Sequence, residues 1–494
     1  MKILFSTGHF GFLRNFESTL RLLAERGHTV HLVADRRDRT DGARMVEALT
    51  CAYPHQFSAE VLPPSKQERW YPLGTACRSS LDYWRYLRPG LEGATALRSR
   101  ARRQAHPLAA RLAEWPVGRS RAGLAALSAA ARACDRAIPP RAEVGALLDR
   151  LAPDVVMLTP LLYFGSQQPD YVRAARARGI PSVLCVGSWD HLTTKGLIHE
   201  VPDRVVVWNE AQRAEAARFH GVPPSRVVVT GAQPYDHWFT TRPSTTREAF
   251  CARVGLPPER PILLYLCSSP FIAPEEVPFV RRWMAAVRAS ADPVLRGASL
   301  LVRPHPQNSR QWQGVRLQDA DAGAVVWPET GANPVDAEAR AQYYDSMFHS
   351  LAVVGVNTSA LIESGIVGRV VYSVATDDFA GTQEATLHFQ HLKSVNGGLL
   401  HLATSLDEHV AQLERLVSGR DAAVPPREFV EGFVRPHGLD VPATPRVVDA
   451  IEATARLRPA REPDPLGRRV LRGLLSPVAA LAQATASRRS THQP

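Results

Sequence analysis

The chain has 494 residues, of which 45% are hydrophobic and 22% are charged. This composition is that of a globular protein, and the length predicts two or three domains because one core rarely grows beyond about 300 residues. The formal net charge of +11 favours anionic partners such as phosphates, nucleotides or an acidic membrane face. The excess is almost entirely arginine, which base composition alone can produce, so we expect no nucleic-acid partner.

The cysteines and the apolar runs indicate a cellular location. Six cysteines are scattered without C-x-x-C spacing, which favours a reducing compartment over disulfides or structural zinc. The first apolar run ends at Gly8 and is too short for a signal peptide, and no window reaches the ~20 apolar residues that cross a bilayer. We expect a cytoplasmic protein, or one held peripherally at the inner face of the membrane.

The chain opens with a strand over residues 2–6, a helix over 16–28 and a strand over 29–35. This βαβ order predicts a parallel sheet. The intervening turn contains only Gly8 and Gly11, so it lacks the G-x-G-x-x-G fingerprint of dinucleotide binding. A nicotinamide oxidoreductase is therefore the least favoured function.

Residues 66–150 are rich in arginine and alanine and predict a helical insertion, with a basic cluster at Arg98, Arg100, Arg102 and Arg103. Two interpretations stay open: a solvated helical face, or an acceptor-side or membrane-facing insertion. Short β-branched runs then alternate with helical patterns up to residue 240. Such alternation predicts a doubly wound parallel sheet.

A polar stretch marks a linker over residues 241–260, and a second set of alternating strands and helices follows over 261–455. The predicted fold class is therefore α/β, with two tandem doubly wound, Rossmann-like domains over 1–240 and 261–455 that face a cleft. Residues 456–494 predict a basic, partly amphipathic tail, either frayed or lying weakly on a membrane surface.

Ligands of open α/β sheets bind outside the carboxyl ends of the strands, and this rule selects particular loops of the second domain. The segment VNTSALIES brings a strand to a helix start with two hydroxyls, which suits a phosphate, although serine and threonine are also the preferred N-caps. Glu363 follows one position too late for a capping box, which favours a ligand role such as binding a ribose hydroxyl.

His305 lies between two prolines directly after an apolar run, so it is either part of a stiff turn or a phosphate ligand. The presence of two phosphate-competent loops in one domain favours the second. The predicted donor-site residues are Ser268, Ser269, Arg303, His305, Thr358, Ser359 and Glu363, with Thr382, Gln383, Glu384 and His388 as a possible donor loop. No spaced acidic pair is present in a suitable loop, so we expect neither a metal nor another cofactor.

An HP motif after one strand, followed by a Ser/Thr pair at a helix start and an acidic residue, resembles the GT-B glycosyltransferases. The pattern is most similar to the branch of CDP-glycerol glycerophosphotransferases, polysialyltransferases and capsule Kdo transferases. This resemblance implies that His305 and the Thr358–Ser359 turn hold the donor phosphates. The Gly-His before the first helix resembles that of GT-B enzymes in which the histidine is the general base, here His9.

In the first domain, Asp190 follows a strand and is the alternative base, while Trp189 could stack on an acceptor and Lys195 could meet a phosphate. We expect His199 and His220 on the surface. The predicted function is metal-independent transfer from a nucleotide-sugar or a CDP- or CMP-activated donor to a cell-envelope glycan or lipid, at a possible anionic membrane surface. The alternatives are a nucleotide-sugar epimerase of the same fold and an inactive GT-B-like binding protein.

Overall fold

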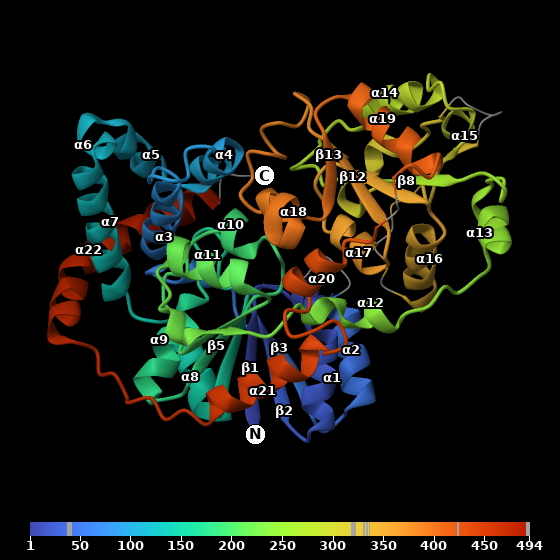
Figure 1. The fold of residues 1–494 in the computed structure, drawn as a ribbon. Coiled ribbons are helices and arrows are strands. Elements are labelled where there is room, and N and C mark those ends of the chain that lie inside the picture. Colours follow the sequence, from blue (N-terminus) through green and yellow to red (C-terminus); the bar gives the residue numbers. More distant parts are fainter. Residues whose placement is uncertain are drawn as a thin grey trace. The chain divides into compact units, whose positions relative to one another are not determined.

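The computed structural model describes residues 1–36, 42–317, 323–329, 331, 334, 336–421 and 424–490. The chain forms two compact units, the first comprising Met1–Pro234 with Arg435–Pro494 and the second Tyr235–Val434. Each unit contains one parallel β-sheet with helices around it (Figure 1). The predicted fold of two tandem doubly wound α/β domains is confirmed.

The sheet of the first unit has the strand order β3-β2-β1-β4-β5-β6-β7, and every neighbouring pair is parallel. The strands are β1 (Lys2–Thr7), β2 (Thr29–Ala34), β3 (Phe57–Val61), β4 (Val155–Thr159), β5 (Ser182–Cys185), β6 (Arg204–Val207) and β7 (Val227–Val229). Apolar runs form the central strands because helices cover both faces, and every residue of β4 is buried.

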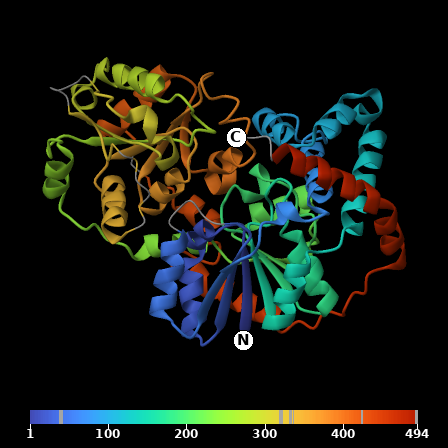
Figure 2. The ribbon, with the colours of Figure 1, turned by 180° about the vertical axis from the view of Figure 1, so that it is seen from behind.

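Helices pack on both faces of this sheet. They are η1 (Phe10–Phe16), α1 (Glu17–Glu25), α2 (Gly42–Ala52), α8 (Ala142–Leu151), α9 (Pro169–Arg178), α10 (His191–Thr194), α11 (Glu210–His220), η3 (Pro224–Arg226) and α21 (Ala443–Ala455). On one face, α1 and α21 bury Leu20 and Ile451 against β1 and β4. On the other face, α8, α9 and α11 bury Leu147, Tyr171 and Ala216. Figure 2 shows the same unit from behind.

The boundary predicted at residue 455 is wrong, because the chain leaves the second unit at Val434. Helix α21 packs on the first sheet, where Val447, Val448 and Ile451 are fully buried among residues of β1 and α1. Its pattern is that of an ordinary amphipathic helix, so the sequence does not reveal which of two sheets the helix covers.

The sheet of the second unit has the order β10-β9-β8-β11-β12-β13, again with parallel neighbours. Its strands are β8 (Ile262–Leu266), β9 (Ser299–Arg303), β10 (Ala324–Val326), β11 (Ala352–Gly355), β12 (Val370–Val374) and β13 (Leu400–Ala403). The helices are η4 (Gln233–Tyr235) at the boundary, then α12 (Asp236–Thr240), α13 (Arg247–Val254), α14 (Val277–Arg288), α15 (Pro293–Arg296), η5 (Pro306–Trp312), α16 (Ala337–Phe348), α17 (Ala360–Ile366), α18 (Phe389–Ser394), η6 (Val395–Gly397), α19 (Leu406–Val417) and α20 (Arg427–Phe433).

Residues 241–260, the predicted linker, are instead an integral part of the second unit. The Ser244 N–H and hydroxyl donate to the two oxygens of the Asp345 carboxylate, over 2.8 and 2.6 Å. Helix α13 follows, with Phe250 and Cys251 fully buried. The polar sequence misled the prediction because its hydroxyl groups bond a buried carboxylate rather than water.

Residues 66–150 are helical, as predicted. They form η2 (Ser65–Gln67), α3 (Tyr71–Arg85), α4 (Thr95–Gln104), α5 (Pro107–Glu114), α6 (Pro116–Arg119) and α7 (Arg121–Ala137), followed by α8. The tail is the long helix α22 (Leu466–Ser490) rather than a frayed end, and it packs on α3 and α7 of the same unit (Figure 1). Among the described residues, no helix combines the length and hydropathy needed to cross a membrane.

Candidate functional site

The strand order of each sheet reverses at one place, between β1 and β4 in the first unit and between β8 and β11 in the second. At such a switch point, the loops after the two central strands run in opposite directions and leave a crevice at the carboxyl edge. These loops contain His9 and Tyr163 in the first unit and Ser268 and Asn357 in the second. The predicted site residues are therefore grouped by the topology of each sheet.

Hydrogen bonds join the two loops at the second switch point. The Asn357 N–H donates to Ser268 Oγ (3.3 Å), and the Ser268 N–H donates to Glu276 Oε2 (2.8 Å). Ser268 is fully buried, so it shapes the loop from beneath, whereas Ser269 is partly exposed. Burial raises the pKa of Glu276 to about 8, although the Ser268 N–H and the Tyr265 hydroxyl both donate to its carboxyl group.

Arg303 ends β9, and its guanidinium lies against two aromatic rings. Its Cζ is 4.8 Å from the ring centroid of Tyr343 and 5.3 Å from that of Trp327. The residue is only 7% exposed, and within the described ranges it has no carboxylate partner and Nη1 has no hydrogen-bond acceptor. Burial lowers its pKa to about 10. A buried cation without a counter-ion is a strong candidate for binding an anion.

The aromatic neighbour of Arg303 also contacts Glu363, the predicted ribose ligand. The Tyr343 hydroxyl donates to Glu363 Oε2 over 2.5 Å. This contact brings the ends of β9 and β10, helix α16 and helix α17 into one cluster. Sequence reasoning missed Tyr343 and Trp327, because their patterns are those of ordinary packing residues.

The two phosphate-competent turns differ in how their side chains are used. Ser359, the N-cap residue of α17, is exposed and its side chain makes no capping hydrogen bond, while Thr358 Oγ1 lies 3.5 Å from the Ala360 N–H. His305 is partly exposed, and its Nδ1 accepts a hydrogen bond from the Gln307 N–H (3.1 Å), which caps η5. The imidazole therefore has a local structural role in addition to any role toward a ligand.

The predicted donor loop separates into buried and exposed residues. Gln383 is fully buried and donates through Nε2 to Val356 O and Val374 O, and the Thr382 hydroxyl donates to Ile272 O (2.6 Å). These two side chains hold the loop. His388 is buried, with its Nε2 3.3 Å from Asn357 Nδ2 at the switch point. Glu384 Oε1 instead lies 2.6 Å from the Lys393 ammonium group.

His9 lies at the first switch point, beside residues that follow β4 and β5. Its Nε2 is 3.5 Å from the Tyr163 hydroxyl, and its ring packs on Phe12, with centroids 4.6 Å apart. A Cβ on Gly8 would come within 2.9 Å of the Tyr163 ring, so the missing side chain lets the two loops approach. Burial lowers the pKa of the neighbouring His191 to about 4.

Asp190, the alternative base, is fixed by two hydroxyls. Ser188 Oγ donates to its Oδ1 (2.5 Å) and Thr194 Oγ1 to its Oδ2 (2.9 Å). Burial lowers the pKa of Lys195, and the Asp190 carboxylate opposes that shift. Trp189 is only 4% exposed, so the ring expected to stack on an acceptor lies within the protein instead.

Two histidines predicted on the surface are also buried. The side chain of His199 is 3% exposed, with Nε2 2.9 Å from Asp82 Oδ1. His220 Nδ1 accepts from the Ile198 N–H, so its Nε2 donates to Leu192 O (2.7 Å). Burial and the Arg85 charge hold the pKa of His220 well below its ordinary value. Both residues lie against helix α3 of the helical insertion. The sequence pattern did not show that the insertion covers these two histidines.

Comparisons with known proteins agree with this architecture. No protein-family model matches the chain, and no curated protein sequence resembles it significantly. Among solved structures, it is similar to a UDP-GlcNAc 2-epimerase from Methanocaldococcus jannaschii, at a TM-score of 0.51 and 10% identity over 92% of this chain and 100% of that chain. It is equally similar to a glycosyltransferase from Rickettsia africae, at a TM-score of 0.51 and 9% identity over 92% of this chain and 99% of that one. The chain thus has the GT-B type of fold.

Proposed function

We propose that this protein is a glycosyltransferase, or a related glycerophosphotransferase, that takes a group from a nucleotide-activated donor. The observation that carries this proposal is Arg303, a buried guanidinium without a carboxylate partner among the described residues. It ends a strand next to the switch point, where sheets of this type bind nucleotides. A donor phosphate would supply the missing negative charge.

The neighbouring residues extend this donor site. His305 follows Arg303 by two positions, and the exposed Ser359 opens α17 close to Glu363, which Tyr343 connects to the Arg303 cluster. We infer that Arg303, His305 and the Thr358–Ser359 turn bind the donor phosphates and that Glu363 binds the ribose. Positive side chains and hydroxyls are sufficient to balance a diphosphate, so the proposed reaction needs no metal.

For the transfer step, the first unit supplies two candidate bases. His9 has the Tyr163 hydroxyl near Nε2, and Asp190 is held by Ser188 and Thr194. Either side chain can accept the proton of an acceptor hydroxyl as that oxygen attacks the donor carbon or phosphorus, while the bond from that atom to the nucleotide breaks and the nucleotide leaves. The proposed acceptor is a cell-envelope glycan or lipid.

A nucleotide panel tests the donor site. Calorimetry of the purified chain with UDP, CDP, CMP, GDP and NAD should show binding of at least one pyrimidine nucleotide. Arg303→Met should weaken that binding by about tenfold or more, since a charge-assisted hydrogen bond contributes about 1.5–3 kcal/mol. Binding of NAD alone, or equal affinity in the variant, would refute the proposed donor site.

The second candidate is a nucleotide-sugar 2-epimerase. The likeness to the M. jannaschii epimerase favours it as much as the likeness to the R. africae glycosyltransferase favours a transferase. The two reactions are separated by incubating the protein with UDP-sugars without any acceptor. An epimerase changes the sugar under these conditions, whereas a transferase needs the acceptor. If transfer occurs, His9→Ala should lower its rate by about a hundredfold or more with nucleotide affinity unchanged, because general bases contribute roughly that much.

We also propose that the protein works at an anionic membrane surface, since α22 presents an apolar stripe. Its large apolar side chains are 50–73% exposed and recur every three to four residues, at Leu466, Val470, Leu474, Val478 and Leu481. Arginines at 468 and 469 lie between them. Such a helix fits the interface of an acidic bilayer. Flotation with phosphatidylglycerol vesicles at low salt, and its loss in Leu474→Ser, tests this part separately from nucleotide binding.

A further inference from the structure

A cavity of about 310 Å³ lies in the first unit, and none of the residues proposed above for catalysis or donor binding lines it. Its walls come from α3 and the turn after it, the last turns of α7, the segment after α10 and the end of α11. This volume is at the lower end of the roughly 300–1,000 Å³ typical of ligand pockets. The cavity can therefore hold a small molecule.

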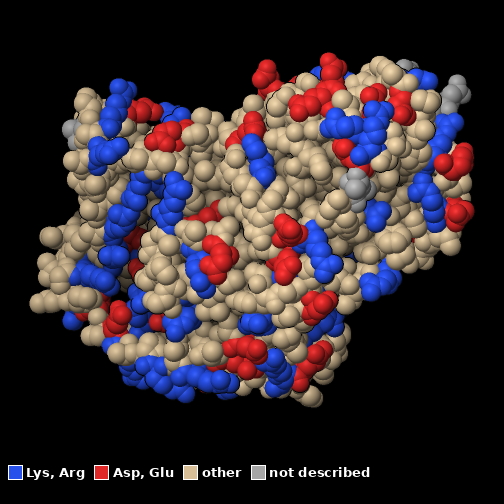
Figure 3. Space-filling model, in the orientation of Figure 1, with Lys and Arg blue, Asp and Glu red and all other residues tan. Residues whose placement is uncertain are grey.

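Four arginines line this cavity: Arg88, Arg132, Arg136 and Arg218. None of the four has a carboxylate partner in the part of the chain that the structure describes, although many other arginines of this unit form ion pairs. Figure 3 shows Lys and Arg side chains gathered over the region of α7 and α11, on the left of the view. Among the described residues, no carboxylate is thus paired with these four lining arginines.

The arginines come from three segments that the fold holds close together, namely the turn after α3, helix α7 and helix α11. Burial and then the charges of Arg88 and Arg136 lower the pKa of Arg132, the least exposed of the four. Arg218 stacks on Phe219, with its Cζ 5.2 Å from the ring centroid. A Cβ on Gly90 would come within 2.8 Å of Arg218 Nη2, so the glycine leaves room for this guanidinium.

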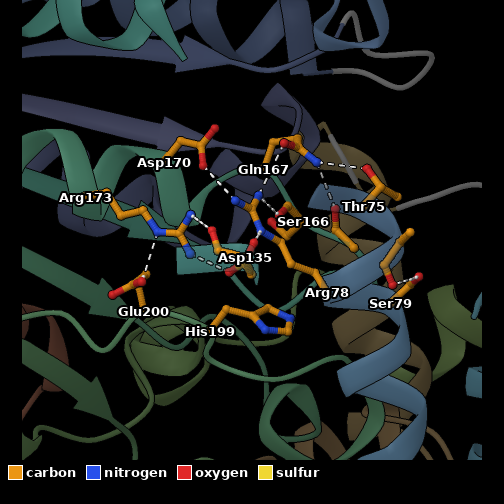
Figure 4. A network of polar contacts seen from close by, with 12 residues as sticks. Thr75, Arg78, Ser79, Asp135, Ser166, Gln167, Asp170, Arg173, His199 and Glu200 are labelled. Carbon is orange, nitrogen blue, oxygen red and sulfur yellow. Dashed lines mark hydrogen bonds and ion pairs between the residues drawn. The ribbon is translucent and has the colours of Figure 1, made fainter. Parts of the chain in front are cut away.

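The acidic residue of the cavity wall does not neutralise these arginines, because it is already bound from behind. Asp135 accepts a hydrogen bond from Arg78 Nε (2.7 Å) and is paired with Arg173. Figure 4 shows this network, in which Arg78 also contacts Asp170 and Arg173 contacts Glu200. The guanidinium groups of Arg78 and Arg173 thus offset the Asp135 charge, and none of the four lining arginines forms an ion pair with Asp135.

The rest of the lining is largely apolar. Leu81, Leu197, Ile198, Val201 and Phe219 complete the wall together with His199, His220 and Gly221. His220 is neutral there, since its Nδ1 accepts a backbone N–H and its Nε2 donates to a carbonyl. A ligand that fits both the arginines and the apolar wall of the cavity has a multiply charged anionic group and a compact organic group.

We propose that this cavity is a second anion site, which binds an organic phosphate with a phosphomonoester or diphosphate group. Guanidinium groups match phosphate oxygens in both charge and geometry, and several arginines bind a dianion more strongly than a carboxylate. The apolar wall contacts the organic part of the ligand. The ligand is either a free phosphorylated metabolite or the headgroup of a lipid, which share this chemistry.

The test uses inorganic pyrophosphate as the probe and the full chain. Calorimetry measures affinity, and hydrogen–deuterium exchange of peptides covering residues 128–137 and 216–221 reports binding at this cavity. We expect protection of both peptides, with binding about tenfold weaker in Arg132→Gln. Arg121→Gln is the matched control, because Arg121 lies on the same helix α7 but outside the cavity lining.

Arg303→Met should leave the protection of these peptides unchanged, so failure of this site is distinguishable from failure of the donor site. Phosphatidylcholine vesicles with and without phosphatidic acid then separate the two ligand sources. Flotation that requires both phosphatidic acid and Arg132 identifies a lipid headgroup, and pyrophosphate binding without such flotation identifies a soluble phosphate. Absence of protection by pyrophosphate, or equal loss in Arg121→Gln, would overturn the proposal.

Discussion

Two buried arginines, one in each unit, have opposite surroundings. Arg78 in the first unit is 1% exposed and donates to the carboxylates of Asp135 and Asp170, over 2.7 and 2.8 Å. Arg303 in the second unit is 7% exposed and lies on the rings of Tyr343 and Trp327, with no carboxylate partner among the described residues. Burial opposes the charge of both, but the two carboxylates raise the pKa of Arg78, whereas that of Arg303 falls to about 10.

This difference separates a residue that stabilises the fold from one that is available to a ligand. The charge of Arg78 is balanced inside the protein, so its removal affects mainly stability. Arg303 has no carboxylate partner among the described residues, so we expect its removal to affect mainly the binding of an anion. The predictions below test this contrast, beginning with the largest expected effect.

Arg78→Met should destabilise the first unit by about 3–5 kcal/mol, because it leaves Asp170 without its guanidinium partner in a buried position. Urea unfolding, followed by hydrogen exchange in each unit, measures the loss. The double variant Arg78→Met/Asp170→Asn should recover part of the stability, since the isolated charge is then gone. Wild-type stability in Arg78→Met would show that the network in Figure 4 is dispensable.

Arg303→Met should show the reverse pattern, with nucleotide affinity reduced by about tenfold or more and thermal stability unchanged or higher. The reason is that methionine removes a desolvated cation and keeps apolar contact with the rings. Arg303→Lys is the informative control, because it keeps the charge but loses the planar stacking. Destabilisation of Arg303→Met as large as that of Arg78→Met would abolish the contrast.

The two units should respond to pH in opposite directions. Burial alone would raise the pKa of Asp135, but Arg78 and Arg173 outweigh it and lower that pKa from 3.8 to about 2. This carboxylate therefore contributes stability above pH 4, which is lost as the pH falls toward 2. Hydrogen exchange in the first unit should accelerate over that range.

Glu276 gives the second unit the opposite dependence. Its pKa is raised from 4.5 to about 8 by burial, so the folded state prefers the protonated form. Its contribution to the stability of the second unit is complete below pH 4.5 and declines as the pH rises through 8. Glu276→Gln should remove this decline, by at most about 1.4 kcal/mol per pH unit for one proton. If the stability of the second unit depends on pH in the same way in wild type and Glu276→Gln, the raised pKa of Glu276 is contradicted.

His305 should give the smallest change in stability, about 1 kcal/mol in His305→Ala, because the variant loses the cap of His305 on η5. His305→Asn separates the two roles, because asparagine can cap the turn but does not have the reach of imidazole. We expect His305→Asn to be as stable as wild type and to bind the nucleotide more weakly. Equal nucleotide affinity in both variants would reduce His305 to a capping residue.

Much of the fold could be predicted from local sequence. Apolar runs between turn residues indicated β1, β4, β8, β9, β11 and β12, since strands buried on both faces leave a continuous apolar signal. The rule for carboxyl edges then selected the loops of Ser268, Arg303 and Asn357 without any coordinates, whereas a family resemblance indicated His9. Short edge strands such as β3 and β13 were missed, because partial burial leaves only a weak pattern.

The particular roles of side chains within these loops were less predictable. Trp189 and Gln383 have sequence positions as favourable as that of Arg303, yet both are buried in packing or backbone contacts. Tyr343 and Trp327 surround Arg303 but are distant from it in the sequence. Burial depends on which helices cover a loop, and local periodicity does not contain that information.

The sequence by itself determined the α/β class, the two parallel sheets and the strand ends where sheets of this type generally bind ligands, since these follow from hydrophobic patterns and chain order. Only the tertiary structure decided that α21 joins the first sheet and that Arg303 lacks a carboxylate partner within the described residues. It also gathered Arg88, Arg132, Arg136 and Arg218 around one cavity. Whether a charge is balanced depends on neighbours from distant parts of the chain, and packing alone brings those neighbours together.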